Sequence, residues 1–377
     1  MNNAATGFPK FDRATKAMMA SIQKGILSPN RDSVVSKEAS AIVFGIRNEI
    51  GNLLHATKPH EVVLTASDTI ALNMILLGMG LKAKDCLIVD SMSHNAISRP
   101  AKHLSLKYGV QIIYANNITD VENAISKYKK KIKGAVFSHA SNVTGDVIDI
   151  QKIGDACFKN NIPFIIDAAQ SIGLVDIDVE KAHASAVTFA GHKGLNGPQG
   201  TGGFYIRKGF KVNPILFGGN GSDSLSITPP LIFPDSFEVG TPAMHDLVGL
   251  YFSLIEIKNQ IGIFTYRYKL RDLVSYAYKQ ISTIPNVVLY GESIKEIPVI
   301  SFNIKGKKCK EVGEYLTNKY DIICRTGVHC AALAVKKLDC IDEFGGTVRI
   351  SFGFFNTKEE IDILINGLKE LVEEQEV

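Results

Sequence analysis

The sequence lacks long apolar segments. No uninterrupted apolar run approaches the length of about 18 residues that a membrane-spanning helix needs. The N-terminus also lacks a basic segment followed by an apolar one, which is the pattern of a secretory signal. We therefore expect a cytoplasmic protein with no membrane partner. Low-complexity tracts are absent too, so the whole chain is available for folded domains.

The sequence also lacks the paired cysteines that typically bind a metal ion, and it carries no large net charge of either sign. The six cysteines form no CxxC pair, so we expect no metal site, and a reducing cytoplasm would keep all six as thiols. The formal net charge of +4 is small for 377 residues and gives no sign of nucleic-acid binding. With 45% hydrophobic residues, the chain can build one large domain and a smaller one.

What the sequence does contain, over residues 60–207, is a regular alternation of apolar and amphipathic segments. The amphipathic segments include Asp68–Leu77 and Ile150–Lys159. Continuous apolar strands with helical crossovers are typical of a parallel sheet covered on both faces. We therefore predict an α/β fold with a seven-stranded, mostly parallel sheet. Its expected strands are Val62–Thr65, Cys86–Asp90, Gln111–Ala115, Ala135–Ser138, Pro163–Asp167, Ala184–Phe189 and Gly203–Ile206.

The pattern changes in the last third of the chain. Long helices are expected at Lys37–Ala56 and from Met244 to about Ile261. Beyond them, strands and helices alternate less regularly, which predicts a smaller α+β domain. Its expected strands are Val287–Tyr290, Val299–Ile304, Ile322–Arg325 and Val348–Phe352, and its expected helices are Lys310–Lys319 and Lys358–Glu373.

Lys193 stands out because of the residues around it. It follows the apolar run Ala184–Phe189 and precedes a segment too rich in glycine and proline to form a helix. A desolvated lysine on a rigid loop suits Schiff-base formation with an aldehyde. The preceding strand ends in Asp167, and a buried carboxylate there would keep the ring nitrogen of pyridoxal phosphate (PLP) protonated. A lysine on a loop is usually no more than a solvated charge. With Asp167 at the end of the preceding strand, a catalytic Lys193 and a solvated Lys193 are about equally well supported.

The motifs around these residues resemble those of a known family. Asp167-Ala168-Ala169-Gln170-Ser171-Ile172-Gly173, followed by Gly191-His192-Lys193, resembles the class V aminotransferase group of fold-type I PLP enzymes. Within that group the chain is most similar to the cysteine desulfurase and selenocysteine lyase branch. Matches extend from Asn3-Ala4-Ala5-Thr6 to Arg349-Ile350-Ser351-Phe352-Gly353. The resemblance implies the PLP-dependent transferase fold, with a large PLP-binding domain at 16–250 and a small domain built from 1–15 and 251–377.

The resemblance also assigns residues to the cofactor. Ser67, Asp68 and Thr69 open a helix whose N–H groups would bind the phosphate, although an ordinary helix cap has the same composition. His94 matches the histidine that stacks on the PLP ring. The other implied cofactor residues are Asn142 and Gln170 near the ring oxygen, His192 at the phosphate, and Thr241. Thr241 resembles the residue with which a neighbouring subunit reaches the phosphate, which implies a homodimer.

A cysteine and two arginines match the cysteine desulfurase and selenocysteine lyase branch in particular. Arg325-Thr326-Gly327-Val328-His329-Cys330 resembles the group II desulfurase motif with its nucleophilic cysteine. The two arginines and His329 make the setting of Cys330 electropositive, which favours the thiolate. Arg349 matches the arginine that pairs with the substrate carboxylate. Arg325 is expected to hold the same substrate or the loop, and Asn142 to contact the substrate.

The resemblance implies a homodimeric, PLP-dependent lyase that converts L-cysteine or L-selenocysteine to L-alanine. Lys193 or His94 would remove the Cα proton, and sulfur or selenium would pass through Cys330 to an acceptor protein. Three positions depart from the family pattern: Ala190, Ala243 and Ala332. Three alternatives therefore stay open. They are a class V aminotransferase acting on a small amino acid, a selenocysteine-specific lyase, and a PLP-binding scaffold protein with low activity.

Overall fold

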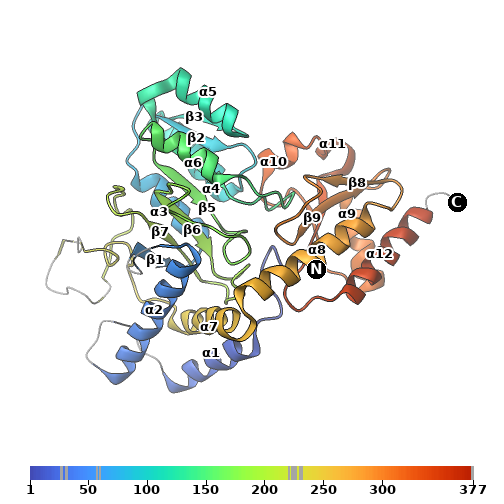
Figure 1. Ribbon diagram of the computed structural model, residues 1–377, viewed down its shortest axis with the longest axis horizontal. Helices are drawn as coiled ribbons and strands as arrows, with labels where there is room; N and C mark the ends of the chain where they lie inside the picture. Colours follow the sequence, from blue (N-terminus) through green and yellow to red (C-terminus); the bar gives the residue numbers. More distant parts are fainter. Residues whose placement is uncertain are drawn as a thin grey trace.

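Two β-sheets organise the computed structural model, which describes residues 1–25, 29, 33–56, 58, 61–219, 221, 227–228 and 232–374 (Figure 1). In the larger sheet the spatial order is β1-β7-β6-β5-β4-β2-β3. The strands from β6 to β3 in that order run parallel, and β7 is antiparallel to both of its neighbours. The predicted seven-stranded, mostly parallel sheet is confirmed. Its strands are β1 (Val62–Thr65), β2 (Cys86–Asp90), β3 (Gln111–Ala115), β4 (Ile132–Ser138), β5 (Phe164–Asp167), β6 (Ala186–Ala190) and β7 (Gly202–Ile206).

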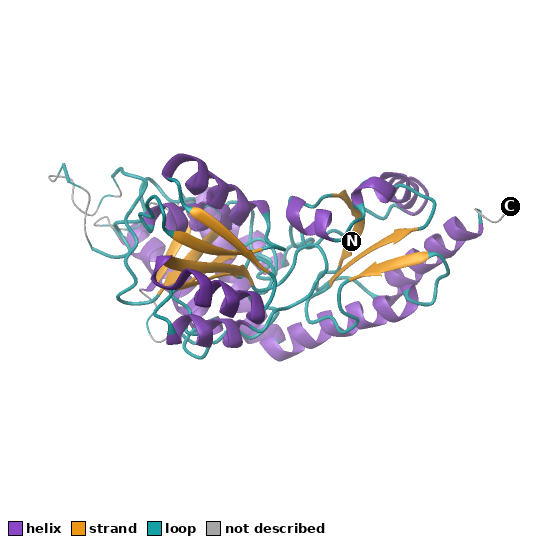
Figure 2. Ribbon diagram, turned by 90° about the horizontal axis from the view of Figure 1, so that it is seen from above, coloured by secondary structure: helices purple, strands orange, loops and turns teal. Residues whose placement is uncertain are grey.

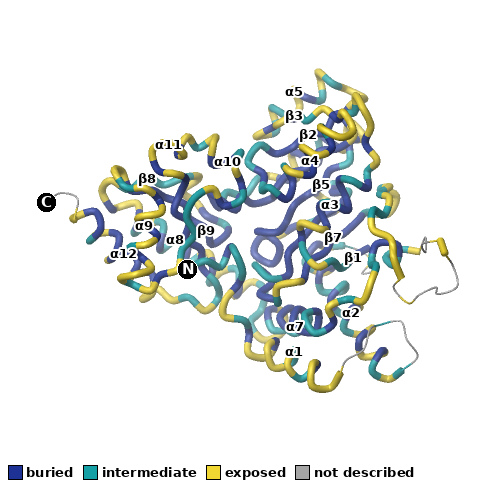
Figure 3. The backbone as a smooth tube through the Cα atoms, turned by 180° about the vertical axis from the view of Figure 1, so that it is seen from behind, coloured by how far each residue is buried: buried dark blue, intermediate teal, exposed yellow. Residues whose placement is uncertain are grey.

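Helices cover both faces of this sheet because its central strands are apolar on both sides. In β5, Phe164 and Ile166 point to one core while Ile165 points to the other, as alternation along a strand requires. The first core also includes side chains from α2 (Val34–Leu53), α5 (Ile118–Tyr128), α6 (Ile150–Lys159) and α7 (Met244–Ile255), and the second from α3 (Asp68–Gly78) and α4 (Asn95–Tyr108). Figure 3 shows the buried centre of the sheet and its more exposed edge at β3.

The smaller sheet is antiparallel throughout, in the order β10-β11-β9-β8 (Figure 2). The predicted strand Ile322–Arg325 is wrong in its bounds, because Ile322 still bonds back to the preceding helix and the strand begins at Arg325. The strands are β8 (Val287–Tyr290), β9 (Val299–Ile304), β10 (Arg325–Gly327) and β11 (Thr347–Ser351), and the helices are α8 (Ile263–Ile281), α9 (Cys309–Tyr320), α10 (Ala332–Lys337), α11 (Ile341–Phe344) and α12 (Lys358–Glu373).

The N-terminal residues lie beside the smaller sheet. Asn2 pairs with Ser351 of β11 in a parallel bridge, and Ala4 N–H donates to the Ser351 hydroxyl over 2.8 Å. Helix α1 (Asp12–Lys24) then packs along α7 of the larger domain (Figure 1). The predicted domain limits at 16–250, and at 1–15 with 251–377, stay a prediction.

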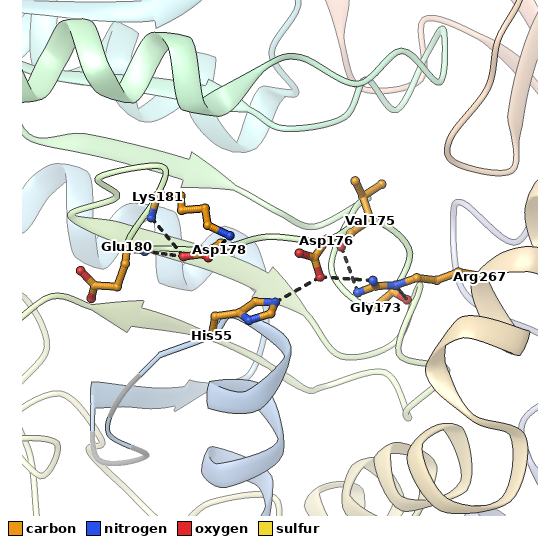
Figure 4. Close-up of polar contacts among 8 residues, drawn as sticks. All are labelled: His55, Gly173, Val175, Asp176, Asp178, Glu180, Lys181 and Arg267. Atoms are coloured by element: carbon orange, nitrogen blue, oxygen red, sulfur yellow. Dashed lines mark hydrogen bonds and ion pairs between the residues drawn. The ribbon is translucent and has the colours of Figure 1, made fainter.

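Helix α8, which precedes the smaller sheet in the chain, contacts the turn after β5. Arg267 donates hydrogen bonds of 3.3 Å each to the carbonyl oxygens of Gly173 and Val175, and it pairs with Asp176, which also contacts His55 (Figure 4). A π-helical segment, Glu256–Ile261, joins α7 to α8. Across the described residues, no single helix is long and apolar enough to span a membrane. One pair, Met244–Ile261 with Ile263–Ile281, passes on length and composition together but is bent by 89°.

Candidate active site

The predicted cofactor residues gather around one cavity at the carboxyl ends of the parallel strands. This position is the usual ligand site of such sheets. The cavity encloses about 470 Å³. All of the predicted cofactor residues except Thr241 line it: Ser67, Asp68, Thr69, His94, Asn142, Asp167, Gln170, His192 and Lys193. Ala190, one of the departures from the family pattern, is also part of the wall.

Lys193 lies on a loop whose backbone is held from three sides. The carbonyl oxygen of His192 accepts a hydrogen bond from Gly7 N–H (2.8 Å). The carbonyl groups of Gly194 and Leu195 accept from the hydroxyls of Tyr266 (3.0 Å) and Ser253 (2.7 Å). The lysine therefore has a well-defined place at the cavity.

The electrostatic environment of Lys193 suits a nucleophilic amine. Burial is the main cause that lowers the pKa of Lys193, and the negative charges of Asp68 and Asp167 oppose it. A lysine with a lowered pKa is a better nucleophile near neutral pH, because more of it is unprotonated.

Asp167 is the last residue of β5 and lies deep in the cavity. Its Oδ1 accepts a hydrogen bond from Ala169 N–H (2.9 Å), and the Ser138 hydroxyl donates to Oδ2 over 3.5 Å. Burial raises the pKa of Asp167, whereas these two hydrogen bonds and Lys193 favour its charge. A buried carboxylate with an open side toward the cavity is well placed to pair with a cation such as a protonated ring nitrogen.

The N-terminus of α3 forms the opposite wall of the cavity. The Ser67 side chain caps this helix by accepting from Ile70 N–H (3.2 Å), so part of the sequence signal was indeed a helix cap. The cap leaves other N–H groups of the first turn available to an anion. His192 also lines this cavity, and burial, followed by the charges of Lys193 and Lys10, lowers its pKa to about 4. His192 is therefore neutral at pH 7.

His94 caps the next helix, α4. Its Nδ1 accepts a hydrogen bond from Ala96 N–H (3.1 Å). Burial, followed by the charge of Lys193, lowers the pKa of His94 to about 4, so its ring is neutral near pH 7. Because Nδ1 is the acceptor, the single ring proton lies on Nε2.

Two buried polar atoms of residues that line the cavity have no hydrogen-bond partner within the described parts of the chain: Asp68 Oδ1 and His192 Nδ1. Buried polar groups are normally satisfied, so such a group of atoms indicates a polar ligand. Together with a lysine amine, a deep carboxylate and a helix N-terminus, they fit PLP. Asp167 would face its ring nitrogen, and the first turn of α3 with His192 would hold its phosphate.

Cys330 follows β10 on a short loop that is tied to the cavity. His329 and Cys330 both adopt left-handed backbone conformations, with φ of 52° and 57°. The carbonyl oxygen of Cys330 accepts from Asn95 N–H (2.7 Å), and that of His329 accepts from Asn142 Nδ2 (2.8 Å). The loop is thus anchored to two segments that carry cavity residues, which sequence reasoning did not reveal.

Arg325 makes the surroundings of Cys330 electropositive. Its Nη2 donates a hydrogen bond to Cys330 Sγ over 2.9 Å. The expectation that His329 adds positive charge beside Cys330 is wrong. Burial, followed by the charges of Arg349 and Arg325, lowers the pKa of His329 to about 3. His329 is 1% exposed, and its Nε2 lies 2.7 Å from the Thr347 hydroxyl. It is a neutral support of the loop.

Arg349 lies on β11, opposite Arg325 in the strand pairing. Its Nη1 donates to the Asn142 carbonyl oxygen (2.8 Å) and its Nη2 to Asn2 Oδ1 (3.4 Å). Its Nε is buried without a partner among the described residues. Burial, followed by the charge of Arg325, lowers the pKa of Arg349 to about 10, so it remains a cation at pH 7. A buried cation bonded to neutral oxygens can accept a carboxylate ligand.

Gln170 makes a second contact outside the cavity, and Thr241 lies apart from the other predicted cofactor residues. Gln170 lines the cavity, but its Nε2 donates to the Ala4 carbonyl oxygen (3.1 Å) and so also fastens the N-terminal segment. Thr241 lines a separate hollow of about 1080 Å³, beside Thr65, Ala66 and Ile70. It lies near the turn before α3, outside the cavity of Lys193.

The fold and the site define a fold-type I PLP enzyme, and comparison with known proteins narrows the class. The sequence model of the family "Aminotransferase class-V" matches residues 1–364. A curated relative from Methanothermobacter thermautotrophicus, "Probable cysteine desulfurase", is 30% identical over 335 residues, which cover 86% of this chain and 82% of the relative. The protein belongs to the class V aminotransferase family.

Solved structures agree with this assignment. "Apo structure of Cysteine Desulfurase from Thermococcus onnurineus NA1" is similar with a TM-score of 0.89 and 28% identity, covering 98% of this chain and 94% of that one. A structure with glycine covalently linked to the PLP-cofactor has a TM-score of 0.82 and 18% identity, covering 98% of this chain and 95% of that one. At that identity the second likeness concerns the fold alone. Family and cavity agree on pyridoxal phosphate as the cofactor.

Proposed function

We propose that the protein is a PLP-dependent cysteine desulfurase, which converts L-cysteine to L-alanine and transfers the sulfur to Cys330 as a persulfide. L-selenocysteine is a possible second substrate, with selenium in place of sulfur. The observation that carries the proposal is the 2.9 Å hydrogen bond from Arg325 to Cys330 Sγ, on a loop anchored to the cofactor cavity. A guanidinium beside a thiol favours the thiolate, which is the nucleophilic form. The curated relative named above supports the same activity.

Arg349 and Asn142 would hold the substrate. The Arg349 guanidinium is a buried cation at the junction between β11 and the Asn142 loop. A planar guanidinium pairs with a carboxylate through two parallel hydrogen bonds, which orients an amino acid as well as binding it. Because Asn142 also lines the cavity, a substrate carboxylate at Arg349 would lie next to the cofactor.

Proton transfer is assigned to Lys193. When bound, PLP withdraws electrons from the substrate and so acidifies its Cα proton. The unprotonated Lys193 amine can accept that proton. His94 is less suited to be the base, because its Nδ1 is already bonded to Ala96 N–H and its Nε2 carries the ring proton. We infer that the neutral His94 ring supports the cofactor instead, as the sequence resemblance implied.

Cys330 would carry out the sulfur transfer. Its thiolate attacks the substrate sulfur, so an S–S bond forms while the Cβ–S bond of the substrate breaks. The electron pair of the broken bond stays with the three-carbon skeleton, which takes up protons and leaves as L-alanine. The sulfur on Cys330 is then available to an acceptor. We propose an acceptor protein as this partner, because the Cys330 side is partly open to solvent.

The test is a brief incubation of the protein with L-cysteine, followed by peptide mass spectrometry. One added sulfur on the peptide that contains Cys330, together with alanine in solution, is the expected result. Cys330→Ala should still bind L-cysteine but release little sulfide, and Cys340→Ala is the matched control because Cys340 is buried. Sulfur on another cysteine, or full activity of Cys330→Ala with cysteine, would overturn the mechanism. Accumulated pyridoxamine phosphate would favour an aminotransferase.

We also propose a homodimer. Thr241 lies outside the Lys193 cavity of its own chain, in a hollow lined by residues of β1, α3 and α7. Apolar side chains are exposed on α2 and α3 beside this hollow, including Phe44 (61% exposed) and Ile70 (37%). A second copy that covers them would bury apolar surface and bring its Thr241 toward this site. A monomeric mass in light scattering at micromolar concentration would contradict this. The cytoplasmic location stays a prediction.

A further inference from the structure

Asp68 is a second buried carboxyl group in the cofactor cavity. It is the first residue of α3, it is 7% exposed, and it lines the same cavity as Asp167 and Lys193. Its backbone is fixed against β7, because a Cβ atom on Gly202 would lie 2.7 Å from Asp68 N. The start of α3 therefore packs closely against β7.

The surroundings of Asp68 give a negative charge little support from hydrogen bonds. Its Oδ1 is buried and without a partner among the described residues. The Thr188 hydroxyl is close enough to oppose the raised pKa of Asp68, but neither Thr188 Oγ1 nor Asp68 Oδ1 has a hydrogen-bond partner among the described residues. Asp167, by contrast, accepts hydrogen bonds from Ala169 N–H and Ser138. A buried carboxylate without donors is unfavourable, whereas a buried carboxylic acid is tolerated.

The electrostatic environment of Asp68 also favours its neutral form. Burial, and then the negative charge of Asp167, raises the pKa of Asp68 to about 8, while Thr188 and Lys193 act in the opposite direction. The two histidines of the cavity, His94 and His192, have pKa values of about 4 and supply no positive charge near pH 7. Lys193 is the cation that favours the charged form of Asp68, and its own pKa is lowered by burial.

The proposed cofactor adds negative charge at the same place. Its phosphate would lie at the N-terminus of α3, and a phosphate monoester is close to doubly charged at pH 7. A carboxylate there would repel it, while a neutral carboxylic acid can donate a hydrogen bond to it. We propose that Asp68 binds the cofactor phosphate as a protonated acid, donating its proton to a phosphate oxygen. This inference rests on the proposed function, because it assumes that PLP occupies the cavity.

The proposal implies that phosphate affinity depends on pH. Asp68 is neutral below its pKa of about 8 and charged above it. Bound phosphate favours the neutral form and so raises this pKa further in the complex. Between the two pKa values, affinity falls by up to about tenfold for each pH unit, because binding must take up a proton. Lys193 also loses charge as pH rises, so the contribution of Asp68 must be measured as a difference between variants.

The experiment measures binding of pyridoxine 5′-phosphate, which has no aldehyde and cannot react with Lys193. Calorimetry at about pH 7 and about pH 9 would compare the wild type with Asp68→Asn. We expect similar affinities at the lower pH, and a loss on going to the higher pH that is up to about tenfold greater for the wild type. Asp90→Asn is the matched control, since Asp90 is 5% exposed and its Oδ1 is engaged by Met92 N–H. Its pH dependence should equal that of the wild type.

Two results would overturn the proposal. If Asp68→Asn binds more than tenfold tighter at both pH values with an unchanged pH dependence, Asp68 is an anion in the wild type. If affinity and pH dependence both equal those of the wild type, Asp68 does not contact the phosphate. Asp68→Ser provides the same comparison if circular dichroism shows that the asparagine variant is misfolded. Failure of every protein to bind the probe would instead count against the proposed function.

Discussion

Arg325 donates a hydrogen bond to the sulfur of Cys330, and the two residues lie at the two ends of a six-residue segment that begins with β10. The backbone of Cys330 is held from the other side by Asn95. The thiol is therefore both placed and polarised before any substrate arrives.

The first prediction concerns the charge of Arg325. Arg325→Gln keeps a hydrogen-bond donor but removes the positive charge that lies beside Cys330 Sγ. We expect alkylation of Cys330 by iodoacetamide at neutral pH to slow, as followed by peptide mass spectrometry. Cys324 is the internal control, because burial raises its pKa to about 11 and Arg325 is not among the causes. Equal alkylation rates in the variant and the wild type would refute a role for the charge.

A second prediction concerns the covalent attachment of the cofactor. Borohydride reduction of the PLP-loaded protein should fix the cofactor on the peptide that contains Lys193, and Lys193→Ala should lose the visible absorbance of lysine-bound PLP. Lys10→Ala is a strict control, since burial lowers the pKa of Lys10 to about 8 and its Nζ lies 3.2 Å from the His192 carbonyl oxygen. The assignment fails if the label is found on Lys10.

The sequence predicts the strands around the cavity well because each one is a short, continuous apolar run. Asp167 and Lys193 could be recognised for the same reason, since Asp167 ends one such run and Lys193 follows another after a short turn. Their neighbour Asp68 could be placed at a helix start, but its burial could not be predicted. That burial depends on Gly202 and Thr188, which come from strands far along the chain.

The loop of Cys330 shows what sequence reasoning misses. The motif predicts the cysteine, but the hydrogen bonds from Asn95 and Asn142 join segments that are distant in sequence. The neutral state of His329 cannot be predicted from the motif, because its burial depends on the packing of the loop against Thr347. The start of β10 was placed too early because Ile322 and Ile323 are apolar, although Ile323 is 59% exposed.

A third prediction tests Asp167. Asp167→Asn retains the shape of the side chain but removes the charge that would face the protonated ring nitrogen. Removing one preorganised group of this kind typically costs about 10² to 10³ in rate, or about 3–4 kcal/mol. We expect PLP to bind still, with Cα–H exchange of alanine in deuterated water slowed to that extent. Nuclear magnetic resonance follows this exchange without needing Cys330, and an exchange rate within a factor of a few of the wild type would contradict the role.

The last prediction concerns the contact between the smaller domain and the Asn142 loop. Lys295 precedes β9, and its side chain is fully buried. Its Nζ donates to the Thr144 carbonyl oxygen (2.7 Å) and to Asp146 Oδ1 (2.8 Å). Removing one partner of a buried ion pair leaves the other uncompensated and is strongly destabilising. Because Asp146 is 29% exposed, water can partly replace the lysine, which reduces the cost.

We therefore expect Lys295→Met to lower the free energy of unfolding by about 3 kcal/mol, measured by urea denaturation. The matched control is Lys310→Met, because Lys310 pairs with Glu314 on the surface, where both side chains are more than half exposed. Its effect should stay within about 0.5 kcal/mol.

The contacts of Lys295 with Thr144 and Asp146 also position the loop from Asn142 to Asp146. Lys295→Met should therefore weaken substrate binding at Arg349, whose Nη1 bonds to the Asn142 carbonyl oxygen. A raised KM for L-cysteine in the folded variant is the expected sign. If Lys295→Met is no less stable than Lys310→Met, the buried pair contributes nothing to the contact.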